Sequence, residues 1–113
     1  IADMMVESFD QKVSRRVSRL ISCALSGDID AAVTAAIALG DMLERAVRRR
    51  TITYDEFVEW IMSVRRQVFR GLGAATAGLI FLGEMDARTA RDGTTYPGRD
   101  EFAAQVGRHL ASC

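Results

Sequence analysis

The chain has 113 residues, enough for one domain with a hydrophobic core of its own. Hydrophobic residues make up 49% and charged residues 27%, the usual balance of a globular protein. The 15 basic and 15 acidic residues cancel, and this argues against a nucleic-acid-binding protein. Pro97 is the single proline and residues of high helix propensity dominate, so the sequence predicts one all-α domain over residues 1–113.

The first predicted helix starts at Ala2 or Ser8 and ends at Leu25. Apolar residues recur at every third or fourth position within it, which is the spacing of a helix with one buried face. That stripe consists of Met5, Phe9, Val13, Val17, Leu20, Ile21 and Ala24.

A second helix is predicted from Ser26 or Asp28 to Val47. Gly27 is suited to end the first helix, and so short a link predicts that the two helices lie antiparallel. The apolar stripe of the second helix includes small residues that let a neighbouring helix approach closely: Ile29, Val33, Ala36, Ile37, Gly40, Leu43 and Val47.

The third helix has the clearest start in the chain. Thr53 followed by Glu56 predicts a capping box, in which each side chain accepts a hydrogen bond from the backbone N–H of the other residue. Ile52 and Phe57 form the matching hydrophobic staple. The buried stripe then continues through Ile61, Val64 and Val68.

The segment from Gly71 to Gly83 carries no charged residue, and a break from the third helix is expected at Gly71 or Gly73. Each glycine costs about 1 kcal/mol relative to alanine in an exposed helix, so this segment is helical only with other elements packed around it. Small residues four positions apart suit close packing. The residues singled out are Gly73, Ala74, Ala77, Gly78, Leu79, Ile80, Phe81 and Leu82.

We therefore expect this segment to be the central helix of a bundle of four to five helices, enclosed by the others. Its composition also resembles the apolar Gly/Ala-rich segments of fusion peptides and pore-forming toxins. Thirteen helical residues extend about 20 Å, short of the roughly 30 Å hydrocarbon core of a bilayer. Partial insertion into a membrane and burial in an oligomer interface are the alternative uses.

After the apolar segment, the sequence predicts a polar, turn-rich stretch from Glu84 to Arg99. Asp92-Gly93 and Pro97-Gly98 are its turn signals. A short final helix is expected from Asp100 to Leu110.

Two cysteines, Cys23 and Cys113, are compatible with one disulfide. Such a bond would close a loop of about 90 residues and stabilise the fold by about 4–5 kcal/mol. Together with a first residue that is not methionine, this pairing favours a processed, secreted protein. The alternative is a pair of unrelated reduced thiols in the cytoplasm.

The basic residues are one lysine, Lys12, and fourteen arginines. Seven arginines fall in two clusters that are expected to lie near the turn between the second and third helices, where they could bind a phosphate, an anionic lipid or RNA. RNA is the weakest of the three, because no aromatic residues interleave with these arginines. The alternative is an ordinary solvated surface. The clusters are Arg45, Arg48, Arg49 and Arg50, and Arg65, Arg66 and Arg70.

The sequence holds no motif for catalysis, cofactor binding or metal binding. His109 is the single histidine and has no companions at metal-ligand spacing. The glycines at 71, 73, 78 and 83 lack the Lys-Ser/Thr ending of a phosphate loop. We therefore expect a protein that is not an enzyme and that needs neither a cofactor nor a metal.

Two functions fit these observations. The first is a secreted, processed helical toxin or effector that acts on a target cell by membrane association or protein binding, a profile that resembles the virally encoded antifungal killer toxins although no motif specifies that family. The second is an intracellular helical interaction or oligomerisation domain. Expected partners are another protein or a second copy of the chain, with a membrane surface as a further partner and nucleic acid disfavoured.

Overall fold

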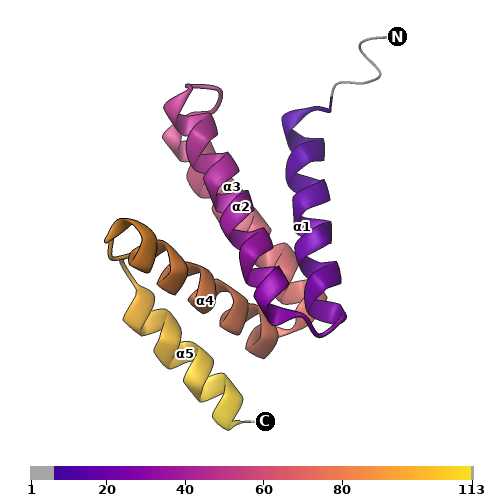
Figure 1. Ribbon diagram of the computed structural model, residues 1–113, viewed down its shortest axis with the longest axis vertical. Coiled ribbons are helices and arrows are strands. Elements are labelled where there is room, and N and C mark those ends of the chain that lie inside the picture. Colours follow the sequence, from indigo (N-terminus) through magenta and orange to yellow (C-terminus); the bar gives the residue numbers. More distant parts are fainter. Residues whose placement is uncertain (1–6, 113) are drawn as a thin grey trace.

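The computed structural model describes residues 7–112, which form five α-helices and no strand (Figure 1). The predicted all-α bundle is confirmed. The helices are α1 (Phe9–Leu25), α2 (Ile29–Arg48), α3 (Tyr54–Leu72), α4 (Ala74–Asp92) and α5 (Arg99–Ala111).

Local capping determines where the first three helices begin. The Thr53 hydroxyl accepts a hydrogen bond from the backbone N–H of Glu56 at 3.1 Å, and the Glu56 carboxylate accepts one from the Thr53 N–H at 3.0 Å, so the predicted capping box is confirmed. Ser8 and Gln11 form a second capping box at the start of α1. Asp28 caps α2 by accepting a hydrogen bond from the N–H of Ala31 at 3.0 Å.

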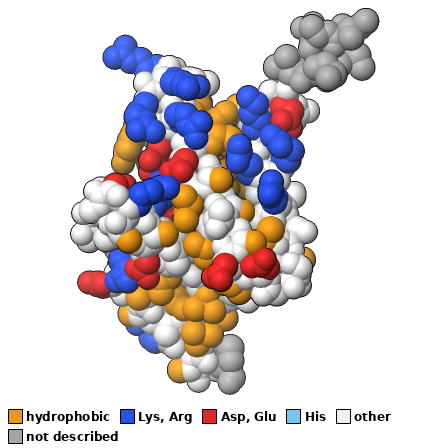
Figure 2. Space-filling model, in the orientation of Figure 1, with side chains coloured by type: hydrophobic (Ala, Val, Ile, Leu, Met, Phe, Trp, Pro, Cys, Tyr) orange, Lys and Arg blue, Asp and Glu red, His pale blue; other side chains and the backbone are white. Residues whose placement is uncertain are grey.

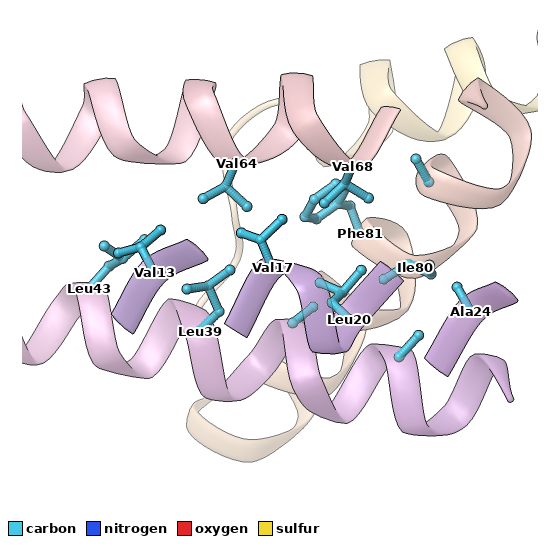
Figure 3. Close-up of a cluster of buried hydrophobic side chains, with 13 residues drawn as sticks. Val13, Val17, Leu20, Ala24, Leu39, Leu43, Val64, Val68, Ile80 and Phe81 are labelled. Carbon is cyan, nitrogen blue, oxygen red and sulfur yellow. The ribbon is translucent and has the colours of Figure 1, made fainter. Parts of the chain in front are cut away.

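The helices pack as two groups that share one core. α1 and α2 run antiparallel from the link at residues 26–28 and diverge toward their other ends, with α3 behind them (Figure 1). α4 and α5 form an antiparallel pair across the lower part of this group (Figure 1). The buried side chains of α1 to α4 meet in one cluster (Figure 3), which includes Val13, Val17, Leu20, Leu39, Leu43, Val64, Val68, Ile80 and Phe81.

The chain departs from the sequence prediction after residue 83. The expected break occurs at Gly73, whose φ is 81°, but α4 then continues to Asp92. The turn-rich stretch predicted from Glu84 to Arg99 is therefore wrong over its first half. The helix persists because Met85 and Arg88 lie buried on the face that carries Ile80 and Phe81.

The apolar segment is central, but it is not enclosed on all sides. α4 packs against α2, α3 and α5. Gly78 lets α5 approach, because a Cβ atom at this position would lie 2.5 Å from Cγ2 of Val106. Leu79, by contrast, is 44% exposed. The close packing expected from the small residues is present, whereas the expected burial around the whole helix is wrong.

Candidate binding groove

The structure separates the two arginine clusters that the sequence predicts to lie near each other. Arg45, Arg48, Arg49 and Arg50 are exposed at the C-terminal end of α2, where the helix dipole favours positive charge. Within residues 7–112, none of the four forms an ion pair. They remain available to bind an anion.

The other three arginines lie in the second half of α3. Arg65 and Arg70 are about 16 and 24 Å along the helix from its first residue. The Arg65 Cζ atom lies 5.7 Å from the ring centroids of both Phe81 and Phe102, so this guanidinium group joins α3 to α4 and α5. Arg66 and Arg70 are exposed. The two arginine clusters therefore lie apart, and the guanidinium group of Arg65 packs on aromatic rings within the fold.

The predicted disulfide lies partly outside the described residues. Cys23 is a half-buried free thiol in α1. Cys113 falls outside residues 7–112. A bond between the two thus stays a prediction, and Cys23 is unpaired within the described chain.

The apolar segment of α4 is covered where it has its smallest side chain. Gly78 is buried against Val106 of α5, and Phe81 stacks on Phe69 of α3 with 6.2 Å between ring centroids. Within residues 7–112, no helix is both long enough and apolar enough to cross a bilayer. Leu79 is already exposed on α4, whereas contact of Gly78 with a membrane would require α5 to separate from α4.

A cleft of about 430 Å³ lies between α1 and α2. Its α1 wall carries Arg16, Arg19 and Cys23, which share one face because they are three and four residues apart. Its α2 wall consists mostly of small side chains, and no acidic residue lines it. The α2 residues are Ala31, Thr34, Ala35 and Ala38.

The same two helix faces carry further cations beyond the cleft. On α1, Lys12 precedes Arg16 by one turn; on α2, Arg45 and Arg49 follow Ala38 at spacings of seven and eleven residues, which place them along one stripe. We call the cleft together with Lys12, Arg16, Arg19, Arg45 and Arg49 the basic groove. Lysine and arginine side chains stand on both sides of this hollow in Figure 2, with hydrophobic side chains between them.

The positive charges of the basic groove have no counterions among the described residues. None of its five cations takes part in an ion pair within residues 7–112. The ion pairs of α4 lie on the other flank of α2, where Arg91 contacts Asp41 at 3.3 Å. These unpaired cations therefore flank a cleft with a floor of small, mostly apolar side chains.

The most buried charge in the described chain belongs to a structural cluster. Arg88, only 2% exposed, forms ion pairs with Glu84, with Glu44 at 3.1 Å and with Asp41 at 3.1 Å. Burial raises the pKa of Glu84 and outweighs the lowering by the hydrogen bond and charge of Arg88. Because the acids of α2 and α4 surround one enclosed guanidinium group, the cluster connects α2 to α4.

A second cleft, of about 800 Å³, lies between α1 and α3. Phe9 and Trp60 meet edge to face there with 5.6 Å between ring centroids, and Met62 is exposed at its border. Its lining carries three carboxylates, Asp10, Glu56 and Glu59, and one arginine, Arg66. It therefore differs in charge from the cleft between α1 and α2 and does not suit an anion.

The described residues contain no arrangement typical of a metal centre. Within residues 7–112, no group of three or more His, Cys, Asp and Glu side chains could hold a metal ion. His109 is exposed in the last turn of α5.

The basic groove is not predicted from the sequence, because the apolar stripes of the first two helices do not determine how Lys12 and Arg19 are placed. Their spacing with Arg16, four and then three residues, was the available signal. The alanines at positions 31, 35 and 38 repeat with the same spacing on the next helix. Only the antiparallel pairing of α1 and α2 brings the two stripes face to face. Comparisons with known protein families, curated proteins and solved structures find no match to this chain.

Proposed function

We propose that this chain is a non-enzymatic helical effector domain that acts by binding a protein partner, and that the basic groove holds an acidic helical segment of that partner. The observation that carries the proposal is the pair of facing stripes on α1 and α2, which combine unpaired cations with a floor of small side chains. Lys12, Arg16 and Arg19 provide one rim, and Arg45 and Arg49 provide the other.

The floor of the groove favours a helix as the occupant. Alanine at positions 35 and 38 lets the backbone of a third helix come within the 8–10 Å axis separation of packed helices. A helix laid along the cleft between α1 and α2 would contact side chains of both stripes. Carboxylates on its flanks would then lie close to the two basic rims. Such complementary charge steers association and selects the partner.

The groove can be tested with a synthetic amphipathic helix that carries alanine and leucine on one face and glutamates on both flanks. We expect it to bind the intact chain, as measured by fluorescence anisotropy, and to bind more weakly as salt increases. A peptide of the same length with lysine in place of glutamate is the charge control and is expected not to bind. Equal binding of both peptides would contradict the proposal.

Two double variants with the same loss of charge locate the site. Arg45→Gln with Arg49→Gln removes one rim of the groove, and we expect it to weaken binding by about tenfold, equivalent to about 1.4 kcal/mol. Arg66→Gln with Arg70→Gln removes two exposed arginines of α3 and is expected to leave binding unchanged. Equal weakening by both pairs would indicate a response to net charge and not a docking site.

The two proposed functions differ in whether the domain acts outside or inside the cell. A secreted toxin or effector would carry the Cys23–Cys113 disulfide, and an intracellular interaction domain would keep both thiols reduced. The mass of the intact protein from its native source, alkylated with and without reductant, distinguishes them. No alkylatable thiol before reduction supports secretion. Two alkylatable thiols support the intracellular domain.

Membrane association through α4 is the alternative mode of action. It is tested by dye release from anionic vesicles, with Leu79→Glu as the variant because Leu79 is exposed and the change is expected to leave the core undisturbed. Our proposal predicts no release by the intact chain. Release that Leu79→Glu abolishes would favour the membrane over a protein partner.

A further inference from the structure

The α1 wall of the cleft concentrates hydrogen-bond donors. Arg16 and Arg19 line the cleft between α1 and α2, on adjacent turns of one helix face. No carboxylate lines this cleft. The Thr34 hydroxyl donates to the carbonyl oxygen of Asp30 at 3.0 Å, so the donors left are the two guanidinium groups and the thiol of Cys23.

Arg16 has a polar atom that the described chain does not satisfy. Its Nε atom is buried and lacks a hydrogen-bond partner within residues 7–112, and the Nη atoms of the same group have no acceptor there either. A buried donor without a partner costs about 1–3 kcal/mol. Native proteins rarely keep such a group unless an ion or a water completes it. A small reorientation of the Arg16 guanidinium toward an anion in the cleft would provide Nε with an acceptor.

The geometry points to a phosphate site: we propose that the cleft binds a phosphate group, either inorganic phosphate or the phosphorylated side chain of a partner. Two guanidinium groups provide two positive charges, which match the −1.5 to −2 charge of a phosphate monoester better than the single charge of a carboxylate. Planar guanidinium groups also suit bidentate contacts to phosphate oxygens. The phosphorylated-partner form of this proposal rests on the proposed function, since it places the partner's phosphate in the cleft of the basic groove.

Cys23 provides a probe inside the cleft. Alkylation of Cys23 and of Cys113 can be followed separately in the reduced, intact chain by mass spectrometry of their peptides. We expect inorganic phosphate to slow the alkylation of Cys23 by about tenfold at ten times its Kd, relative to chloride of equal ionic strength. Alkylation of Cys113 serves as the internal control and is expected to keep its rate. Equal rates at Cys23 in phosphate and chloride would overturn the proposal.

Three variants test whether phosphate protects Cys23 by binding in the cleft. Arg16→Gln and Arg19→Gln each remove one guanidinium group and are expected to abolish the protection of Cys23. Arg15→Gln removes the neighbouring arginine, which pairs with Glu7 at 2.9 Å on another face, and is expected to leave the protection intact. Circular dichroism checks that all three fold. Retention of protection in both cleft variants, or its loss in Arg15→Gln, would overturn the site.

Peptide binding separates this site from the proposed function. The glutamate-flanked helix is compared in three forms, with serine, glutamate or phosphoserine at the end that meets Arg16. We expect the phosphoserine form to bind about tenfold more tightly than the glutamate form and to lose this advantage in Arg16→Gln. If the helix binds but phosphoserine gives no advantage and phosphate gives no protection, the phosphate site is overturned and the groove stands. If phosphate protects Cys23 but no acidic helix binds, the proposed function is overturned.

Discussion

The guanidinium group of Arg88 lies against the backbone of Gly40, and this contact brings α4 close to α2. A Cβ atom at Gly40 would lie 2.9 Å from Cζ of Arg88 and closer still to Nη2. Because Gly40 has no Cβ atom, Nη2 of Arg88 can donate a hydrogen bond to the backbone carbonyl of Ile37 at 2.9 Å. A glycine on one helix thus creates the space in which a charged group of another is buried and satisfied.

This contact predicts opposite effects for the same substitution at two glycines. Gly40→Ala should lower the free energy of unfolding by about 1–3 kcal/mol, because the guanidinium group must leave its acceptors, and this exceeds the gain in helix propensity. Gly107→Ala in α5 should raise it by about 1 kcal/mol, since no heavy atom of the described chain lies within 4 Å of a Cβ there. Urea denaturation measures both. A stabilising Gly40→Ala would contradict the proposed role of the contact.

The ion cluster predicts a pH dependence that Glu84→Gln removes. Burial raises the pKa of Glu84 above its ordinary value of 4.5, so the folded chain holds this proton more tightly than the unfolded chain does. The resulting stabilisation is present below the unfolded pKa and is lost as the pH rises through the folded pKa. The free energy of unfolding of the wild type minus that of the variant should therefore fall between pH 4.5 and pH 7. A constant difference over this range would contradict the assignment.

The contact of Gly78 with Val106 predicts a compensating pair of substitutions. Gly78→Ala places a methyl group 2.5 Å from Cγ2 of Val106 and should destabilise the fold by about 1–3 kcal/mol. Val106→Ala removes the methyl groups that it meets. The double variant should lose less stability than the sum of the two single variants, as measured by a double-mutant cycle in urea. Simple additivity would show that α5 does not pack on Gly78 in solution.

Arg65 is expected to control the attachment of α5. Arg65→Gln removes the cation from between Phe81 and Phe102, and each of these contacts contributes about 0.5–1 kcal/mol. Amide hydrogen exchange should then accelerate in α5 more than in α1 and α2. Arg66→Gln, the exposed neighbour, serves as the matched control and should leave exchange in α5 unchanged. Equal acceleration in all helices would indicate general destabilisation.

Local signals were sufficient wherever a few neighbouring residues determine the conformation. Thr53 and Glu56 are three residues apart, and their reciprocal hydrogen bonds form whatever the rest of the chain does. The break at Gly73 likewise follows from a positive φ that glycine adopts without strain. The limits of α1, α2, α3 and α5 were predictable for the same reason.

The length of α4 and the two charge arrangements depended on contacts between distant parts of the chain. In the sequence, Arg88 is a polar residue in a stretch predicted to be rich in turns. In the structure, it bonds to the backbone of Ile37, 51 positions away. Arg16 and Ala35 belong to different helices, and only the antiparallel packing of these helices places both residues in the lining of one cleft. The sequence by itself determined the all-α class, the main helix starts and the small residues that allow close packing, because these depend on local hydrogen bonding and periodicity. Only the tertiary structure decided which arginines are buried, which are paired and which border a groove, because burial and pairing depend on the elements packed around each side chain.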